Sequence, residues 1–205
     1  MFTGSTEVAT LLQRNIASRL DAQGRPIPLI AETGGMNAMI VDSSALTEQV
    51  VIDVLASAFD SAGQRCSALR VLCLQDEIAD HTLKMLRGAM AECRMGNPGR
   101  LTTDIGPVID SEAKANIERH IQTMRSKGRP VFQAVRENSE DAREWQSGTF
   151  VAPTLIELDD FAELQKEVFG PVLHVVRYNR NQLPELIEQI NASGYGLTLG
   201  VHTRI

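Results

Sequence analysis

The chain has 205 residues, of which 43% are hydrophobic and 22% charged, and its formal net charge is −6. This composition is typical of a soluble globular protein with one large or two small domains. No apolar stretch approaches the roughly 20 residues of a membrane-spanning helix, and the amino terminus lacks the basic and apolar regions of a signal peptide. Acids and bases are interspersed without a long basic run, so the chain offers no electrostatic footprint for nucleic acid or anionic lipid.

The cysteines and histidines argue against a disulfide framework and show no metal motif. Cys66, Cys73 and Cys93 are an odd number of cysteines and include no CxxC spacing. This usage predicts a reducing, cytoplasmic compartment. The four histidines lie far apart in the sequence, and none has a partner at the spacing of a metal site. The sequence therefore predicts no local metal site.

Helices and strands are predicted to alternate along the chain. Apolar residues recur at helical spacing in four segments, at residues 46–58, 79–90, 113–124 and 183–190. Short apolar runs typical of strands occur at Ile27–Ala31, Ala38–Val41, Leu69–Leu74, Pro130–Val135, Phe150–Leu158 and Val172–Tyr178. Most of these runs are continuous, as in strands that helices cover on both faces. The pattern predicts an α/β fold with a largely parallel sheet flanked by helices.

Three regions fit this alternation less well. Residues 136–148 are polar and charge-mixed, and we expect them to form a surface excursion between two core strands. Met1 is followed at once by a turn and a helix start, with no preceding strand. The chain stops directly after the apolar run Leu197–Val201. Both ends look cut, so we expect one domain that is a fragment of a larger protein.

Cys66 lies in a small, polar turn between a predicted helix and a predicted strand. A thiol is nucleophilic as the thiolate, which needs nearby positive charge, backbone N–H groups or a helix terminus. Arg65 and Arg70 are candidates for the charge. Taken alone, Cys66 is explained more simply as a surface cysteine without a role. Cys73, in a buried strand, and Cys93, at the end of an amphipathic helix, are predicted to be structural.

Three further motifs carry groups suited to chemistry, and each has an ordinary structural alternative. Glu32 ends an apolar run before two glycines, so its carboxylate either reaches a site or is simply solvated at a turn. Gly4 and Ser5 open a helix, where free N–H groups either bind an anion or receive an ordinary N-cap. The stretch Lys166–Val172 has an acid and an aromatic residue before Gly-Pro, and on its own it indicates only a loop.

In order and spacing, the four motifs resemble the aldehyde dehydrogenase superfamily. Phe-Thr-Gly-Ser-Thr is followed about thirty residues later by Glu-x-Gly-Gly, then after about thirty more by Gly-Gln-x-Cys, and about a hundred later by Glu-x-Phe-Gly-Pro-Val. The resemblance runs from residue 2 to about residue 203. It implies the thiol-bearing catalytic domain of such an enzyme over residues 1–205, with residues 1–30 as the tail of the cofactor-binding domain.

The resemblance implies a division of labour between two catalytic residues. Cys66 is the nucleophile that attacks the aldehyde carbon, and the resulting thiohemiacetal becomes a thioester. Glu32 is the general base that activates water to hydrolyse the thioester.

The resemblance also implies NAD as the cofactor. Gly4 and Ser5 correspond to the contact with its pyrophosphate, and Thr33 to a position whose backbone contacts the carboxamide. Glu167 corresponds to the acid that holds the nicotinamide ribose, and Phe169 packs near the nicotinamide ring. Thr33 and Ala9 stand where the commonest pattern has leucine and glycine, and neither change removes a reacting group.

The serine after the thiol narrows the resemblance. Gly-Gln-Arg-Cys-Ser-Ala-Leu-Arg-Val-Leu is similar to dehydrogenases that oxidise L-glutamate γ-semialdehyde, in which this serine, here Ser67, helps to bind the α-carboxylate of the substrate. Other stretches resemble the bacterial bifunctional proline utilization family. These enzymes add an FAD-dependent proline dehydrogenase, which is outside this chain, and some also carry a DNA-binding segment. The resemblance implies a small-molecule substrate and a homo-oligomeric cytoplasmic parent protein, with peripheral attachment to the inner membrane left open.

Three alternatives stay open beside this interpretation: a dehydrogenase for another semialdehyde, a cysteine hydrolase that pairs Cys66 with a histidine, and an inactive interaction module. We expect the isolated chain to be inactive. In the family, the asparagine of the oxyanion hole and the lysine that grips the adenosine ribose precede the segment matched here. The loop that anchors the substrate follows it.

Overall fold

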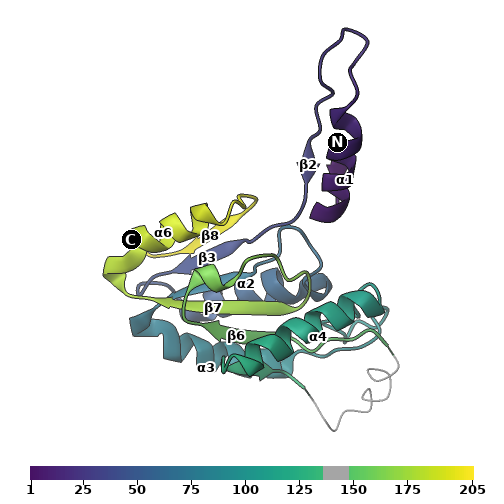
Figure 1. Cartoon of the computed structure of the whole chain (residues 1–205). Coiled ribbons are helices and arrows are strands. Elements are labelled where there is room, and N and C mark those ends of the chain that lie inside the picture. Colours follow the sequence, from purple (N-terminus) through teal and green to yellow (C-terminus); the bar gives the residue numbers. More distant parts are fainter. Residues whose placement is uncertain (136–147) are drawn as a thin grey trace.

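A computed structural model of the chain describes residues 1–135 and 148–205; the predicted surface excursion at 136–148 lies, except for residue 148, outside the described residues. Its main feature is a six-stranded sheet with helices on both faces (Figure 1). The strand order is β5-β6-β7-β4-β3-β8, and every neighbouring pair is parallel except β5 and β6. The predicted α/β fold with a largely parallel sheet is confirmed.

The central strands follow the continuous apolar runs of the sequence. β3 (Ala38–Val41) and β4 (Val71–Gln75) are buried along their whole length, and β7 (Val172–Tyr178) is buried at all positions but one. β6 (Thr154–Leu158) lies beyond β7. The sheet ends at β5 (Val131–Gln133) on one side and at β8 (Leu199–His202) on the other. Strands that are apolar on both faces occupy the middle because helices cover them on both sides.

Helices α2 (Thr47–Phe59) and α3 (Asp76–Glu92) pack together on one face, and α4 (Ser111–Ser126) and α6 (Leu183–Ala192) lie on the other (Figure 1). Alternation along β7 shows the two faces, because side chains three positions apart in a strand point in opposite directions. Arg177 binds Asp80 of α3, whereas His174 contacts His120 of α4. Connections between parallel strands of one sheet are right-handed, so connections that run in opposite directions along the sheet place their helices on opposite faces.

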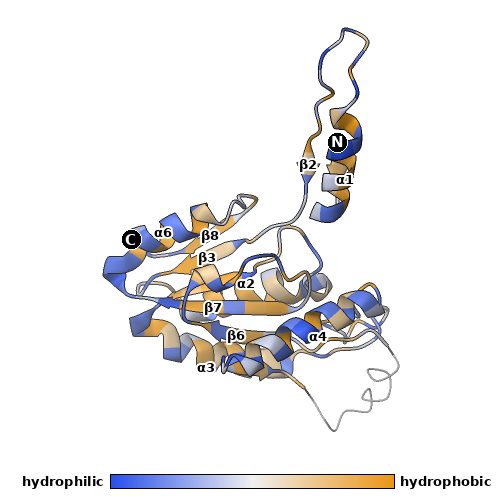
Figure 2. Ribbon diagram, viewed as in Figure 1, coloured by the Kyte–Doolittle hydropathy of each residue, from blue (hydrophilic) through white to orange (hydrophobic). Residues whose placement is uncertain are grey.

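The strands of the sheet are mostly hydrophobic (Figure 2), and the buried apolar core is formed by them and by helices α2, α3, α4 and α6. Three short 3-10 turns complete the described elements: η1 (Asp60–Gly63), η2 (Phe161–Glu163) and η3 (Arg180–Gln182). Within the described ranges, no helix is long and apolar enough to cross a membrane.

Residues 1–33, here called the arm, stand away from the sheet (Figure 1). The arm holds β1 (Phe2–Thr3), α1 (Thr6–Ala17) and β2 (Ala31–Glu32), and β1 pairs in parallel with β2. Ala9 is the one residue of α1 that is buried. The arm therefore adds little to the hydrophobic core and is a unit apart from the sheet.

Two expectations for the arm are wrong. A strand does precede the first helix, and the predicted strand Ile27–Ala31 is reduced to Ala31–Glu32. Pro28, within this run, lacks the N–H that a ladder needs, which explains why only the end of the run pairs. The short ladder is held by backbone bonds, from Phe2 N to Ile30 O and from Gly4 N to Glu32 O, which leave no pattern of side chains to detect.

A pair of histidines joins α4 to the sheet. The Nε2 atoms of His120 and His174 are 2.9 Å apart, and Nδ1 of His174 lies 3.2 Å from the carbonyl oxygen of Arg70. Because a carbonyl only accepts, Nδ1 of His174 carries the hydrogen, and its Nε2 accepts from His120. Burial lowers the pKa of His174 to about 3, and His120 adds to this effect. His174 is therefore neutral in the folded protein at neutral pH.

We predict that His174 makes the stability of the fold fall in acid. The unfolded chain takes up this proton near pH 6.5, whereas the folded protein resists it down to about pH 3. The contribution of His174 is therefore complete above pH 6.5 and falls by about 1.4 kcal/mol per pH unit below it. Urea denaturation at pH 7 and pH 5 should show a weaker pH dependence for His174→Gln than for the native chain. The exposed His81 is the control: His81→Gln should keep the native pH dependence. Equal slopes for the native chain and His174→Gln would refute the assignment.

Candidate active site

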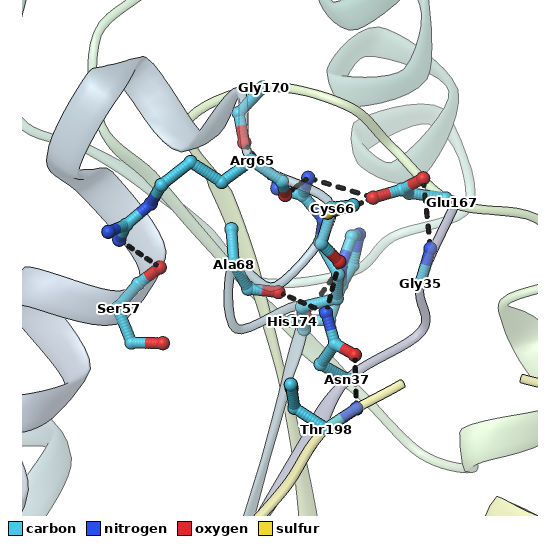
Figure 3. Close-up of polar contacts among 11 residues, drawn as sticks. Gly35, Asn37, Ser57, Arg65, Cys66, Ala68, Glu167, Gly170, His174 and Thr198 are labelled. Carbon is cyan, nitrogen blue, oxygen red and sulfur yellow. Dashed lines mark hydrogen bonds and ion pairs between the residues drawn. The ribbon is translucent and has the colours of Figure 1, made fainter. Parts of the chain in front are cut away.

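Residues from four distant parts of the chain meet where parallel strands begin (Figure 3). Gly35–Asn37 precede β3, Cys66–Arg70 precede β4, Glu167–Gly170 come just before β7, and Thr198 precedes β8. These four strands are parallel, so their amino-terminal ends lie at the same edge of the sheet. The edge thus brings the predicted nucleophile and the predicted ribose-binding acid into one neighbourhood.

Cys66 lies at the exposed corner of a tight turn. The N–H of Ala68 donates to the carbonyl of Arg65 at 3.0 Å, which makes Cys66 and Ser67 the central residues of a turn, Arg65–Ala68, called the thiol turn below. Both central residues are exposed. In the part of the chain that the structure describes, their backbone N–H groups donate no hydrogen bond. Adjacent free N–H groups of this kind suit an anion.

Arg70 is the buried charge beneath the thiol turn. Its side chain is 1% exposed and forms an ion pair with Glu167, with Nη2 2.8 Å from Oε1. Nε donates to the same carboxylate oxygen, Nη1 to the carbonyl of Gly170, and Nη2 also to the carbonyl of Arg65. Burial lowers the pKa of Arg70, and the Glu167 charge opposes this. An arginine remains charged in proteins, so Arg70 is a fixed cation at the site.

Glu167 is held from two sides. Oε1 faces Arg70, and Oε2 accepts a hydrogen bond from the N–H of Gly35 at 3.2 Å. The ring of Phe169 lies over the guanidinium of Arg70, 5.3 Å from ring centroid to Cζ, and its side chain is 45% exposed. The structure therefore places both predicted cofactor residues of this stretch around one arginine, with the aromatic ring facing outward.

Two adjacent glycines allow the backbone before β3 to approach these groups. Gly34 has a φ of 117°, and a side chain there would meet Oε2 of Glu167 at 2.4 Å. A Cβ at Gly35 would lie 2.5 Å from the carbonyl oxygen of Cys66. The Gly-Gly of the sequence is thus required by close packing of three segments, in addition to the turn that it predicts.

The turn before Cys66 is strained as well as close-packed. Ser61 and Ala62 adopt positive φ values of 56° and 53°, which cost energy for residues with a Cβ. Gly63 follows with a φ of 65°, and a Cβ there would meet the carbonyl oxygen of Gly170 at 2.2 Å. The side chain of Gln64 stabilises the segment by donating hydrogen bonds to the carbonyls of Ser61 and Pro107 and accepting one from the N–H of Ile109. The thiol turn therefore follows a segment whose path is tightly specified.

The arm carries the other predicted cofactor residues. Ser5 caps α1, with Oγ accepting from the N–H of Val8 at 3.2 Å. The hydroxyl of Thr6 donates to the carbonyl of Thr33 at 3.3 Å, so the start of α1 and Thr33 lie side by side. Glu7 lies in the first turn of the same helix, and hydrogen bonds to its own backbone N–H and to Ser5 lower the pKa of its carboxyl group. The predicted pyrophosphate and carboxamide positions are thus neighbours.

The structure does not join Glu32 to the thiol. Glu32 is exposed at the end of β2, and its backbone carbonyl accepts from Gly4 N. Among the described residues, its side chain forms no hydrogen bond with Cys66. The general-base role of Glu32 accordingly stays a prediction.

All four histidines lie in the described ranges, and none is hydrogen-bonded to Cys66. His120 and His174 bond to each other, His202 lies 3.2 Å from Asp53, and His81 is exposed on α3. A cysteine hydrolase needs a base within hydrogen-bond reach of its thiol, so the arrangement disfavours that alternative. Over the same ranges, no cluster of three or more metal-ligating side chains is present.

The sequence indicates one support of the thiol turn but not the other. Of the two candidates for charge near Cys66, Arg70 lies beneath the turn and bonds to the carbonyl of Arg65, whereas the side chain of Arg65 donates to the carbonyls of Ala56 and Ser57. Asn37 was not singled out, although it is buried and bonded to the thiol turn. Its signal was a polar residue directly before a buried apolar strand.

We predict that Gly35→Ala displaces the thiol turn and lowers stability by about 1–3 kcal/mol, because the new methyl group overlaps a fixed carbonyl. Gly88, within α3, is the matched control, since a Cβ there meets nothing within 4 Å. Gly88→Ala should raise stability by about 0.5–1 kcal/mol. Urea denaturation of both variants checks the pair, and similar effects of the two substitutions would contradict the close approach at Gly35.

Comparison with known proteins shows the family of the chain. The chain matches the aldehyde dehydrogenase family over residues 1–205. It is 93% identical, along its whole length, to the bifunctional protein PutA of Salmonella typhimurium, of which it spans 16%. It is 32% identical to the 1-pyrroline-5-carboxylate dehydrogenase of Bacillus licheniformis, with 99% of this chain and 38% of that protein covered.

A solved structure extends the likeness to the fold. Betaine aldehyde dehydrogenase from Staphylococcus aureus in complex with NAD+ superposes with a TM-score of 0.85 at 30% identity, over 99% of this chain and 39% of that one. This chain is therefore a member of the aldehyde dehydrogenase family and spans a minor part of the length of the relatives it matches.

Proposed function

We propose that this chain is the thiol-bearing part of an NAD-dependent dehydrogenase that oxidises L-glutamate γ-semialdehyde to L-glutamate in proline catabolism. The observation that carries the proposal is the Cys66–Ser67 pair at an exposed turn, with free backbone N–H groups, in a chain of this family. The name of one relative, 1-pyrroline-5-carboxylate dehydrogenase, supports this substrate over another semialdehyde.

Cys66 acts as the nucleophile in this scheme. Its thiolate attacks the aldehyde carbon, a C–S bond forms, and the carbonyl π electrons move to oxygen. The free N–H groups of Cys66 and Ser67 are suited to bind the developing oxyanion. When bound, NAD supplies the acceptor for the hydride that leaves this carbon. A water molecule, whose proton passes to Glu32, then attacks the thioester carbon. The C–S bond breaks, the carboxylate product is released, and the thiol of Cys66 is regenerated.

Ser67 is the proposed contact for the amino acid end of the substrate. It is exposed next to the nucleophile, and its hydroxyl makes no hydrogen bond among the described residues. A free hydroxyl at this place can donate to the α-carboxylate. An aldehyde without that group loses the interaction, so Ser67 contributes to selectivity between semialdehydes and simple aldehydes.

The residues present suit the nicotinamide side of NAD. The start of α1 offers helix N–H groups for a pyrophosphate at Gly4 and Ser5, with the acidic Glu7 in the same first turn. Thr33 adjoins this helix start, and the exposed ring of Phe169 lies by Glu167 and Arg70. Glu167 would hold the ribose hydroxyls.

Further properties belong to the proposed parent protein, because the chain spans 16% of the PutA sequence it matches. We propose that the parent also carries an FAD-dependent proline dehydrogenase, acts in the cytoplasm and forms homo-oligomers. A DNA-binding segment would lie outside this chain. We expect the isolated 205 residues to be inactive, because the family's lysine for the adenosine ribose and the asparagine that completes the oxyanion hole are contributed by other segments.

We predict that Cys66→Ser abolishes activity in a hybrid in which this chain replaces its counterpart in the Salmonella typhimurium PutA protein. Semialdehyde-dependent NADH formation should fall by more than about a thousandfold, because the nucleophile is lost. Cys73→Ser is the control: Cys73 is buried in β4, and this variant should keep nearly full activity. Equal losses from both cysteine changes would contradict the assignment.

We predict that Glu32→Gln in the same hybrid lowers kcat about a hundredfold but keeps an initial burst of NADH, because only the hydrolysis of the thioester is blocked.

We predict that Ser67→Ala acts on the substrate rather than on the chemistry. In the same hybrid, kcat/KM for L-glutamate γ-semialdehyde should fall about tenfold to a hundredfold, as expected for a hydrogen bond to a charged group. The value for propanal, which has no carboxylate, should change less than about twofold. An equal loss of kcat/KM for both aldehydes would show that Ser67 supports the turn and does not bind the carboxylate.

A further inference from the structure

Asn37 is the second buried side chain that holds the thiol turn. It is 3% exposed, and its Nδ2 donates to the carbonyl oxygen of Cys66 at 2.7 Å and to that of Ala68 at 2.8 Å (Figure 3). An amide nitrogen has two hydrogens, so both are used on the turn. The peptide plane that follows the nucleophile is therefore fixed by one side chain.

The backbone of Asn37 holds the end of the same segment. Its carbonyl oxygen accepts from the N–H of Arg70 at 2.9 Å and from the N–H of Val71 at 3.1 Å. On the other side of the amide, Oδ1 accepts from the N–H of Thr198 at 3.1 Å. One buried residue thus joins the starts of three parallel strands, β3, β4 and β8.

Asn37 and Arg70 divide the carbonyls of the thiol turn between them. Arg70 holds the carbonyl of Arg65, and Asn37 holds those of Cys66 and Ala68. Because these carbonyls point to buried donors, the N–H groups of Cys66 and Ser67 remain free on the exposed side. A nucleophile and its oxyanion donors must be set within a fraction of an ångström, and a misplacement of about 1 Å costs up to about a hundredfold in rate.

We propose that Asn37 is a positioning residue for Cys66: its amide orients the thiol turn so that the sulfur and the free N–H groups face the substrate. The proposal rests on the proposed function of Cys66 as the nucleophile. It goes beyond that function because it assigns the orientation of the thiol to a buried amide outside the turn.

Asn37→Asp is the sharpest test because it keeps the shape and the acceptor for Thr198 but removes both donors to the turn. Gln75→Glu is a matched control at the opposite end of β4. Gln75 is 4% exposed, its Oε1 accepts from Ser43 N, and its Nε2 donates to Glu77. This exchange likewise keeps an acceptor and removes a donor, far from the thiol turn. Asn37→Ser is the second variant and adds no charge. The short serine side chain leaves at least one carbonyl of the thiol turn without a donor.

The first readout is the alkylation of Cys66 by iodoacetamide in the 205-residue chain, followed by peptide mass spectrometry. Asn37→Asp and Asn37→Ser should slow alkylation at pH 7 by about fivefold, since the thiolate is the reactive form and loses its ordered surroundings. Gln75→Glu should leave the rate unchanged at a comparable loss of stability in urea. Slowing by Asn37→Asp but not by Asn37→Ser would trace the effect to the added charge and overturn the proposal.

The second readout is kinetic, in the hybrid protein. Both Asn37 variants should lower kcat by about tenfold or more with KM for NAD unchanged, because the cofactor contacts are elsewhere. Native alkylation and kcat in folded Asn37→Ser would overturn the proposal, and this variant decides the matter if Asn37→Asp does not fold. An inactive native hybrid would count against the proposed function alone, since the alkylation test does not depend on activity.

Discussion

The buried guanidinium of Arg70 is the constraint on which the site depends. A charge taken out of water must be matched by partners of opposite charge and by hydrogen bonds, or the fold loses several kcal/mol. Glu167 supplies the charge, and the carbonyls of Arg65 and Gly170 supply the remaining partners. Each of these partners belongs to a segment of the site. Satisfying one cation therefore sets the position of the acid, of the Gly-Pro loop and of the thiol turn together.

The parallel sheet makes this arrangement possible. Cofactors in open α/β sheets are usually found at the carboxyl ends of the strands, whereas the groups described here lie before β3, β4, β7 and β8, at the amino-terminal ends. Segments more than a hundred residues apart become neighbours because their strands start in register. The side chains that hold them, Arg70 and Asn37, are polar residues placed directly before apolar strands.

The sequence predicts the sheet well and the supports of the site poorly, for physical reasons. Ala38–Val41 and Val172–Tyr178 were predicted with the bounds that they have, because continuous burial requires a continuous apolar run. The β1–β2 ladder left no such pattern, since its bonds are made by backbone alone. The spacing of motifs points to Cys66 and Glu167, which the structure brings to the same edge of the sheet. Asn37 could not be identified in the same way, because its role follows from where β3 begins relative to the thiol turn.

The arm and the sheet divide the proposed chemistry between a rigid part and a less firmly packed part. Cys66, Arg70 and Asn37 are tied to strands of the core, whereas Ser5, Glu32 and Thr33 lie on the arm, whose helix buries Ala9 alone. A helix of 12 residues is marginal without tertiary packing. The chain enters the sheet from the arm through Gly34 and Gly35, where an added Cβ would meet Glu167 and the carbonyl oxygen of Cys66. The connection between the two parts is therefore packed directly against the acid and the thiol turn, with no room for a side chain.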